Sequence, residues 1–350
     1  MVSGVFEHGL VDPPAAAEPV EPAPEPLERR EYDAPALMRG HPPVLRDPNK
    51  LVVFRIACPD GTAGGHVSYS RWAEAPLPGA VDPAGAARLL AVRDGFYDYE
   101  PVAEAGPAVE WHVNFADPRL FCFYGSSLFA QDEMQVAEHP VFGSLREALL
   151  AERRSTLTVE GGRLAPVLVV GAERRVRIAT DRNAAQGRPD GLYGNAFAQA
   201  SAEAVRRATT AIDPPTITNL IAMAAPTGGH GRYRRAEIEL VLATAFTGFR
   251  AAVTETRRVA GADARVIVHS GFWGCGAFGG NRVLMTLLQL LAAEMAGLDR
   301  LVLHVGERVS VEQATVVLRD ALAADTSTST AELITLIEAV GMDWGHRDGN

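Results

Sequence analysis

The sequence contains few cysteines, and they lie far apart. Cys58, Cys122 and Cys275 are the only cysteines among 350 residues, and none belongs to a C-x-x-C pair. This spacing argues against a disulfide framework and against a zinc site built on thiolates. We therefore expect a protein of a reducing compartment, the cytoplasm.

Long apolar runs and an excess of positive charge are also missing. No run of about 18 uncharged apolar residues occurs, and the first residues, MVSGVFEHGLVDPP, lack the features of a secretion signal. The formal net charge of -10 is opposite to what affinity for a phosphate backbone requires. We expect no membrane insertion and no direct nucleic-acid binding, and we expect any phosphate to be held locally by backbone N–H groups.

Motifs for metals and for phosphoryl transfer are absent as well. His230, His269 and His304 show no H-x-x-x-H spacing and have no carboxylate at ligand spacing, so no metal is predicted. The sequence also lacks G-x-x-x-x-G-K-[ST], the motif of P-loop enzymes. No cofactor is predicted.

Composition divides the chain into four parts. Residues 1–46 contain VDPPAAAEPVEPAPEPLE, a Pro/Ala/Glu-rich composition that predicts a disordered arm. Residues 47–107, which begin with the strand-length run LVVFRIA, are expected to form an accessory segment. The main domain is expected at 108–324, and a linker with a short helix at 325–350.

The main domain alternates strand-like and helix-like stretches, which predicts an α/β fold with helices on both faces of a sheet. The expected strands are 111–116, 165–170, 174–180, 218–225, 265–271 and 300–307. The expected helices are 195–212, 236–253, 282–296 and 311–322.

The most informative motif is the glycine-rich segment SGFWGCGAFGG at 270–280, between an expected strand and an expected helix. Glycine leaves no Cβ between the backbone and a ligand, so successive N–H groups and the helix N-terminus can surround a phosphate. The segment predicts a diphosphate site, in which Trp273 and Phe278 could pack against a nucleoside or belong to the core. Without a ligand, the same glycines would make a tight turn.

Gly274 to Gly279 also spell G-x-G-x-x-G, the signature of a Rossmann dinucleotide site. Two features count against that alternative. Only one strand–helix unit follows the motif, and Glu307, the next acidic residue at a strand end, lies beyond the roughly 20 residues expected for a ribose partner.

Trp273 to Gly280, WGCGAFGG, resemble residue for residue a segment of the catalytic domain of the poly(ADP-ribose) glycohydrolases. The flanking helices and strands are also similar to that family, over roughly residues 111–320. The resemblance implies a macrodomain-like three-layer α/β/α sandwich with an N-terminal accessory segment. It also implies an ADP-ribose site that includes Gly274, Cys275, Gly276, Ala277, Phe278 and Gly279.

The catalytic signature of that family is three glycines followed, after a spacer, by Gln-Glu-Glu. Gln131, Asp132 and Glu133 stand in the place of the last three. By resemblance, Glu133 is the acid/base that protonates the leaving oxygen, Asp132 orients the ribose hydroxyls, and Gln131 holds the loop. The alternative is an ordinary acidic helix start. The glycine triplet is replaced by Phe121-Cys122-Phe123, and Gly125 is the only glycine nearby.

Three more residues are expected to contact the ligand. Asn114 and Asp117 follow an expected strand, where open α/β sheets place ligand contacts. Tyr193, in GLYGNAF, would stack on adenine by resemblance, or else cap the core.

The sequence thus predicts a glycosidase that hydrolyses the ribose–ribose linkage of poly(ADP-ribose) or a related ADP-ribosyl bond. Its partners would be ADP-ribose, the polymer and ADP-ribosylated proteins. The replaced glycine triplet favours an alternative, a catalytically degenerate ADP-ribose-binding module. A further alternative, an NAD-dependent oxidoreductase, rests on G-x-G-x-x-G alone.

Overall fold

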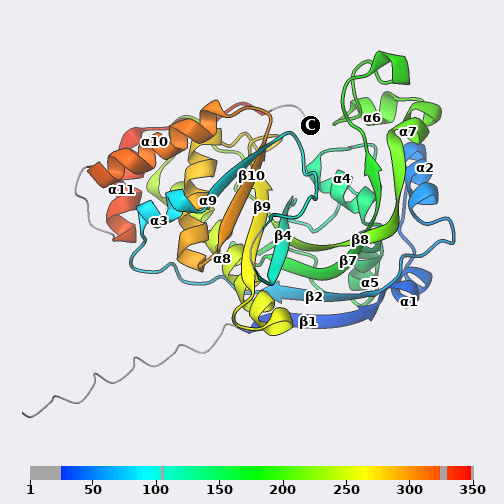
Figure 1. Ribbon diagram of the computed structural model, residues 1–350, viewed down its shortest axis with the longest axis horizontal. Coiled ribbons are helices and arrows are strands. Elements are labelled where there is room, and N and C mark those ends of the chain that lie inside the picture. The colour runs from blue at the N-terminus through cyan, green and yellow to red at the C-terminus, as the bar shows by residue number, and fades with distance from the viewer. Residues whose placement is uncertain (1–24, 104–105, 324–328, 348–350) are drawn as a thin grey trace, which may run out of the picture.

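A computed structural model describes residues 25–103, 106–323 and 329–347. A mixed eight-stranded sheet runs through this part of the chain in the order β1-β2-β7-β8-β4-β9-β10-β3 (Figure 1). Its strands are β1 (Pro26–Asp33), β2 (His66–Trp72), β3 (Leu90–Asp94), β4 (Ala108–Phe115), β7 (Val167–Ile178), β8 (Thr209–Met223), β9 (Arg265–Gly271) and β10 (Arg300–Val305). A separate hairpin consists of β5 (Val159–Glu160) and β6 (Arg163–Leu164).

Four of the seven strand pairings in this sheet are parallel and three are antiparallel. Strands β8, β4, β9, β10 and β3 pair in parallel, so their carboxyl ends meet at one edge. Strands β1, β2 and β7 pair antiparallel, and β7 joins β8 in the same way. The Rossmann alternative is therefore wrong, because a dinucleotide-binding sheet is mostly parallel and has a different strand order.

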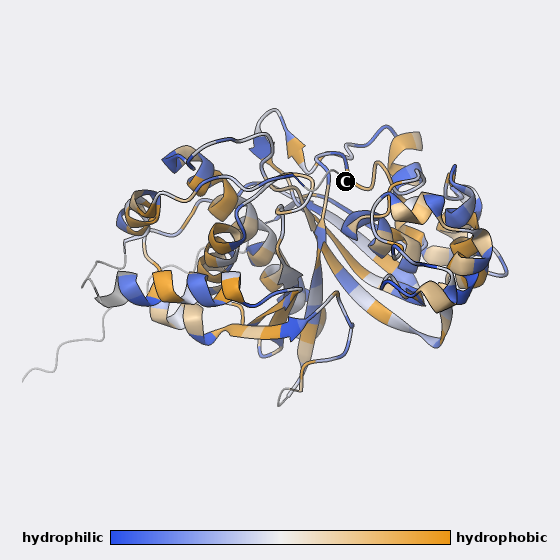
Figure 2. Cartoon of the chain, turned by 90° about the horizontal axis from the view of Figure 1, so that it is seen from above, coloured by the Kyte–Doolittle hydropathy of each residue, from blue (hydrophilic) through white to orange (hydrophobic). Residues whose placement is uncertain are grey.

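Helices cover both faces of the sheet, which confirms the predicted three-layer α/β arrangement. One face carries α3 (Pro83–Arg88), α8 (Arg235–Ala260), α9 (Arg282–Ala296), α10 (Val309–Ala323) and α11 (Thr330–Val340). The other carries α1 (Ala34–Gly40), α2 (Pro48–Ala57), α4 (Gln131–Glu138), α5 (Val141–Ala151), α6 (Ala196–Gln199) and α7 (Ala202–Ala208), with the short 3-10 helix η1 (Ala184–Gln186) nearby. Figure 2 shows these two groups of helices from above, with hydrophobic and hydrophilic residues alternating along them. None of the described helices has the length and apolar content needed to cross a bilayer.

The central strand β4 shows how the sheet separates core from site. Trp111 and Val113 pack into the core beneath α8 and α9. Successive side chains of a strand point to opposite faces, so His112 and Asn114 face the other way. Asn114 there reaches α4. The apolar half of β4 thus anchors the strand, while its polar half faces the helix that carries Asp132 and Glu133.

The N-terminal prediction is wrong from residue 25 onward, while residues 1–24 lie outside the described part. Strand β1 pairs with β2 along its length, and Leu37 and Met38 of α1 are buried. The Arg29 guanidinium also binds the carboxylate of Glu255 on α8. Edge pairing and a few apolar side chains thus order a segment whose average composition resembles a disordered arm.

The segment 47–107 is not a separate accessory body, because it supplies strands β2 and β3 to the main sheet. Its first run, LVVFRIA, forms helix α2 and not the expected strand. The side chain of Asp47 accepts hydrogen bonds from the N–H groups of Asn49 and Lys50, and Pro48 occupies the first turn. Asp-Pro is a helix start, and this local signal outweighs the length of the apolar run.

Three further boundaries differ from the sequence-based expectation. The two strands expected at 165–170 and 174–180 are one irregular strand, β7. The helix expected at 195–212 divides into α6 and α7, and strand β8 begins at Thr209. The linker expected after residue 324 falls largely outside the described residues, whereas α11 buries Leu333, Ile334 and Ile337 in the core.

Candidate functional site

A cavity of about 930 Å³ opens at the carboxyl edge of the parallel strands. This volume is in the range of small-molecule sites, about 300–1,000 Å³. The chain leaves β4 toward α4 on one face, and it leaves β9 toward α9 on the other. Neighbouring parallel strands whose connections leave to opposite faces open a crevice between them, the usual ligand position in α/β sheets.

Most of the residues expected in the site meet in this cavity. Those that line it are Asp117, Gln131, Asp132, Glu133, Tyr193, Gly274, Cys275, Gly276, Ala277 and Phe278. Asn114 and Gly279 were expected to contact the ligand but do not line it.

Gln131 fixes the start of α4 to the end of β4. Its Oε1 accepts a hydrogen bond from the N–H of Phe115 at 2.8 Å, and its Nε2 donates to the carbonyl of Val113 at 3.0 Å. The side chain thus holds the loop between these elements, the role the resemblance implied. The two carboxylates that follow Gln131 are consequently held at the strand edge.

Asn114 lies behind Asp132 and is completely buried. Its Nδ2 donates to Oδ1 of Asp132 and to Oε1 of Gln135, both at 3.0 Å. The alternation of β4 turns the side chain of Asn114 under α4, so it does not line the cavity, and its expected ligand contact stays a prediction. Asn114 orients the carboxylate of Asp132.

Asp132 and Glu133 are buried carboxyl groups in one cavity wall. Burial raises the pKa of Asp132 well above its ordinary value, and the negative charge of Glu133 raises it further. Burial also raises the pKa of Glu133, while the charge of Lys50 opposes this rise. One oxygen of Glu133 accepts the N–H of Ala130 at 3.0 Å, so the residue also caps α4. The two interpretations of the Gln-Asp-Glu motif, helix start and cavity carboxyl, are therefore compatible.

Sequence reasoning missed Lys50, which is almost completely buried. Burial lowers the pKa of Lys50 to about 8, although the charge of Glu133 acts in the opposite direction. Its Nζ donates to the carbonyl of Tyr124 at 2.8 Å and lies 5.2 Å from the centre of the Phe129 ring. The sequence feature that could have indicated this residue is a single lysine directly before the apolar run 51–54.

The raised pKa of Asp132 gives a prediction about stability. The folded protein keeps a proton on this carboxyl that the unfolded chain releases near pH 4, so the free energy of unfolding should fall as pH rises from there. Asp132→Asn cannot ionise and should gain stability over the wild type as pH rises. Urea unfolding at pH 4, 6 and 8 measures this, with the exposed Asp263→Asn as control. The prediction would be contradicted if the free energies of unfolding of Asp132→Asn and the wild type differed by the same amount at all three pH values.

The glycine-rich loop lines the cavity with residues whose N–H groups are not used within the described part of the protein. Internal hydrogen bonds from Trp273, Cys275, Gly279 and Gly280 close its turns, and the φ angles of Gly274 and Gly279 are +75° and +71°. Between these turns, four N–H groups make no hydrogen bond to another described residue; they belong to Gly274, Gly276, Ala277 and Phe278. Helix α9 follows directly, so its N-terminus adds a positive partial charge.

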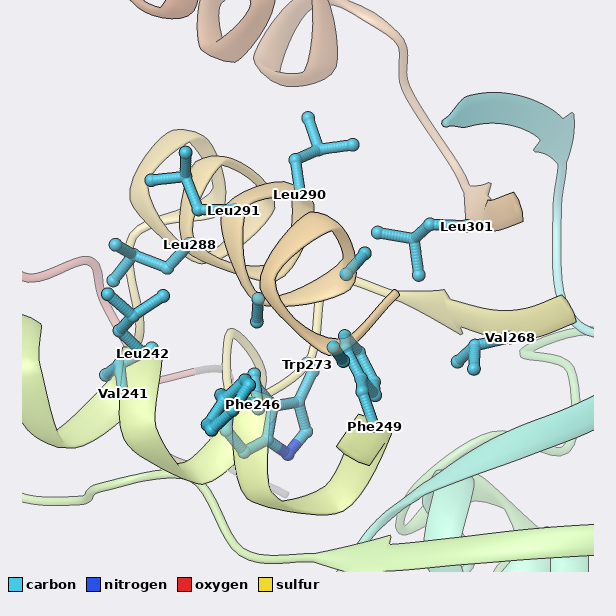
Figure 3. Close-up of a cluster of buried hydrophobic side chains, with 14 of the residues drawn as sticks. Val241, Leu242, Phe246, Phe249, Val268, Trp273, Leu288, Leu290, Leu291 and Leu301 are labelled. Atoms are coloured by element: carbon cyan, nitrogen blue, oxygen red, sulfur yellow. The ribbon is translucent and has the colours of Figure 1, made fainter. Parts of the chain in front are cut away.

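The two loop aromatics have different roles. The indole N–H of Trp273 donates to the carbonyl of Met223 at 3.0 Å, and the ring is buried against Phe249 and α9 (Figure 3). Trp273 therefore belongs to the core, although it also borders the cavity, whereas Phe278 is only partly buried and lines the cavity. Burial raises the pKa of the neighbouring Cys275 thiol to about 12, so this group stays neutral beside a bound anion.

The loop that replaces the glycine triplet turns one ring inward and one outward. Phe121 has a φ of +53°, is fully buried, and stacks on Phe142 at a centroid distance of 5.3 Å. Phe123 is 40% exposed and lines the cavity, with the Arg119 guanidinium 5.6 Å from its ring. The N–H groups of residues 122, 124 and 126 close turns within the loop. This loop therefore offers the cavity an aromatic face and not a row of N–H groups.

Three more residues noted in the sequence make contacts with other parts of the protein. A carboxylate oxygen of Asp117 accepts the N–H of Arg119 at 2.9 Å, which stabilises the turn after β4. Tyr193 stacks on Phe96 at a centroid distance of 5.4 Å at the cavity wall. Gly125 packs against the N-terminal segment, since a Cβ there would lie 2.1 Å from the carbonyl of Val44.

A second wall comes from residues 95–99, which sequence reasoning assigned to an accessory segment. Tyr97 and Tyr99 line the cavity. The Tyr99 ring lies between His112, at 4.5 Å, and the guanidinium of Arg174, at 4.0 Å. Arg174 in turn donates to the carboxylate of Glu138 at 2.8 Å. Only the pairing of β3 with β10 brings this wall to the site.

Arginines line the same cavity, although net charge suggested that backbone N–H groups alone would hold a phosphate. They are Arg174, Arg177, Arg188, Arg207 and Arg282. Net charge averages over the whole surface, and the fold gathers these cations from distant positions. Backbone N–H groups are thus not the only donors in the cavity wall, and phosphate binding by backbone alone stays a prediction.

The fold and the glycine-rich loop define a macrodomain, and comparison with known families agrees. Residues 190–311 match the family described as poly(ADP-ribose) glycohydrolase, macro domain fold. This part of the chain is similar to that family, which confirms the resemblance seen in the sequence. The match includes Tyr193 and the glycine-rich loop but not residues 131–133, so the roles of those residues stay predictions.

Solved structures of glycohydrolases are distantly similar to the chain. The poly(ADP-ribose) glycohydrolase of Thermomonospora curvata bound to the inhibitor ADP-HPD is 14% identical, with 77% of this chain and 88% of that chain covered and a TM-score of 0.40. The enzyme of Deinococcus radiodurans in complex with ADP-ribose is 14% identical, with coverages of 85% and 94% and a TM-score of 0.34. These scores are too low to transfer either ligand to this chain. No curated protein matches the sequence.

Proposed function

We propose that the protein binds ADP-ribose and hydrolyses poly(ADP-ribose) or a related ADP-ribosyl bond. One observation carries the proposal: the buried carboxyls of Asp132 and Glu133 line the same cavity as the glycine-rich loop with its unengaged N–H groups. A diphosphate needs such N–H donors, and a glycosidic bond needs a carboxyl acid. The match of residues 190–311 to the glycohydrolase family supports the part of this combination that lies in the glycine-rich loop.

In the proposed reaction Glu133 acts first as acid and then as base. Its proton passes to the leaving oxygen as the bond between that oxygen and the anomeric carbon breaks. Water then adds to the anomeric carbon and returns a proton to Glu133. The raised pKa of Glu133 favours the protonated form that the first step requires. The positive charge of Lys50 stabilises the carboxylate between the two steps.

Asp132 has the geometry of an orienting group. Because Asn114 holds one of its oxygens, the carboxyl has a fixed direction from which it can bind ribose hydroxyls. Phe123 and the Phe96–Tyr193 pair supply aromatic surface for a base.

A second function, ADP-ribose binding without turnover, is favoured by the loop at 121–123. Its N–H groups at Cys122 and Tyr124 are engaged in turns, so this side of the cavity lacks the backbone donors that a glycine triplet would provide. Calorimetry with ADP-ribose, followed by turnover assays on polymer and on protein-linked ADP-ribose, separates the two functions. Binding without release of ADP-ribose would leave only the binding module. The cytoplasmic location stays a prediction.

Gly276→Val is expected to weaken ADP-ribose binding at least about tenfold, a loss of about 1.4 kcal/mol. The branched side chain would occupy space in the cavity wall beside the unengaged N–H groups of the loop. Calorimetry measures the effect, and Gly79→Val is the control because a Cβ at Gly79 meets no atom within 4 Å. Unchanged affinity in a folded Gly276→Val protein would remove this loop from the site.

A further inference from the structure

The end of the described chain lies against the glycine-rich loop. Residues 342–347, here called the C-terminal strap, follow α11 and pair with the segment before α8. The carbonyl of Met342 accepts the N–H of Tyr233 at 2.9 Å, and the N–H of Trp344 donates to the carbonyl of Gly231 at 2.8 Å. Two backbone hydrogen bonds thus fix the course of the strap.

Trp344 is the anchor of the strap. Its ring stacks on Tyr233 at a centroid distance of 4.2 Å and an interplanar angle of 13°. A Cβ on Gly229 would lie 1.8 Å from the indole, so only glycine leaves room for this ring. The strap is therefore packed into a fitted position on the protein surface.

The strap also holds the residue from which α9 begins. Asn281 caps this helix, because its Oδ1 accepts the N–H of Leu284 at 3.1 Å. The Nδ2 of Asn281 donates to the carbonyl of Asp343 in the strap at 2.8 Å, and its N–H donates to the Tyr233 hydroxyl at 3.2 Å. Two groups thus fix the N-terminus of α9 at the cavity. One is the strap itself, through Asp343, and the other is Tyr233, on which Trp344 stacks.

Beyond Trp344 the strap touches the loop itself. A Cβ on Gly345 would lie 2.9 Å from the carbonyl of Gly280, and a Cβ on Gly279 would lie 3.2 Å from Cγ of Arg347. Between these two contacts, His346 lines the cavity. At Gly279 the φ of +71° and the nearby strap both disfavour a side chain. None of these strap residues belongs to the region 190–311 that matches the family.

We propose that the C-terminal strap is part of the ligand site: Trp344 positions the glycine-rich loop, and His346 contacts the phosphate groups of a nucleoside diphosphate held there. The inference rests on the proposed function, since it places the diphosphate at residues 274–278. A histidine ring carries an N–H donor in each of its protonation states, so His346 can donate to a phosphate oxygen next to the loop.

The first experiment tests the contact of His346 by calorimetry. His346→Ala should weaken ADP-ribose binding about tenfold, the loss expected for one hydrogen bond to a charged group. Binding of adenosine, which has no phosphate, should not change, and the melting temperature should stay the same because His346 is exposed. His346→Gln keeps a donor and should recover part of the affinity. His66→Ala, at an exposed histidine outside the cavity, is the control.

The second experiment tests the positioning role of Trp344. Trp344→Ala should weaken ADP-ribose binding and speed hydrogen exchange of the amides of 272–281, whereas Trp344→Phe keeps a ring on Tyr233 and should restore both. With a substrate that turns over, Trp344→Ala should raise KM more than it lowers kcat, since Glu133 is untouched.

The outcomes separate this inference from the proposed function. If the wild type binds ADP-ribose and both alanine variants bind it equally well, the strap is not part of the site and the proposed function stands. If the wild type does not bind ADP-ribose, the proposed function and the His346 contact both fail. Unchanged hydrogen exchange in Trp344→Ala overturns the positioning role in either case.

Discussion

Glu133→Gln is expected to lower the release of ADP-ribose about 10²–10⁴-fold, the usual loss when a general acid is removed. The amide keeps the size of the side chain and can still accept the N–H of Ala130, so the start of α4 should not change. Affinity for ADP-ribose should stay close to that of the wild type. Single-turnover release from polymer and from protein-linked substrate measures the rate, and calorimetry measures the affinity.

The control for this change is Glu312→Gln, the same substitution at an exposed position of α10 outside the cavity. It should keep wild-type turnover. A Glu133→Gln protein as active as the wild type would move the acid elsewhere, and Asp132, in the same wall, is the first alternative. If the wild type turns over no ADP-ribosyl substrate, only the second function, ADP-ribose binding without turnover, would remain.

Phe121→Ala is expected to lower the free energy of unfolding by about 3–5 kcal/mol, the cost of removing a fully buried ring. The stack with Phe142 is lost, and the cavity left behind lies in the core beneath α5. Phe123→Ala, two residues away, removes a ring that is 40% exposed and should cost less than about 1 kcal/mol. Urea unfolding of the two variants measures the difference.

The left-handed backbone conformation of Phe121 allows a further comparison, between an alanine and a glycine at this position. Its φ of +53° is costly for any residue with a Cβ, by roughly 1–2 kcal/mol, and costs glycine nothing. Phe121→Gly should therefore be at least as stable as Phe121→Ala, the reverse of the order found at ordinary positions. A glycine variant clearly less stable than the alanine variant would show that the left-handed backbone does not strain this loop.

The glycine-rich loop could be predicted because its signal is local. Five glycines between a strand and a helix form one turn, and the structure finds N–H groups of that turn at the cavity. The role of Gln131 came from the resemblance, and its partners Val113 and Phe115 lie only 18 and 16 residues before it. Both features depend on residues that are close in the sequence.

The rest of the site depends on residues brought together from distant positions. Lys50 reaches the carbonyl of Tyr124 and the neighbourhood of Glu133 because α2 packs beside α4. Tyr99 comes to the site because β3 pairs with β10, more than two hundred residues later. Neither pairing has a local pattern, so the sequence indicated neither residue. Asn114 was placed at the right strand end, but its burial depends on where α4 packs.

Strand β4 lies between β8 and β9 in the parallel part of the sheet. The region 190–311 that matches the family model contains β8, β9 and β10 but not β4. Cut out as a fragment, that region would have a gap where β4 belongs, with unpaired N–H and C=O groups along β8 and β9. Open strand edges of this kind favour aggregation. The stretch that matches the family model is therefore not a complete structural unit, because residues 108–115 lie between two of its strands.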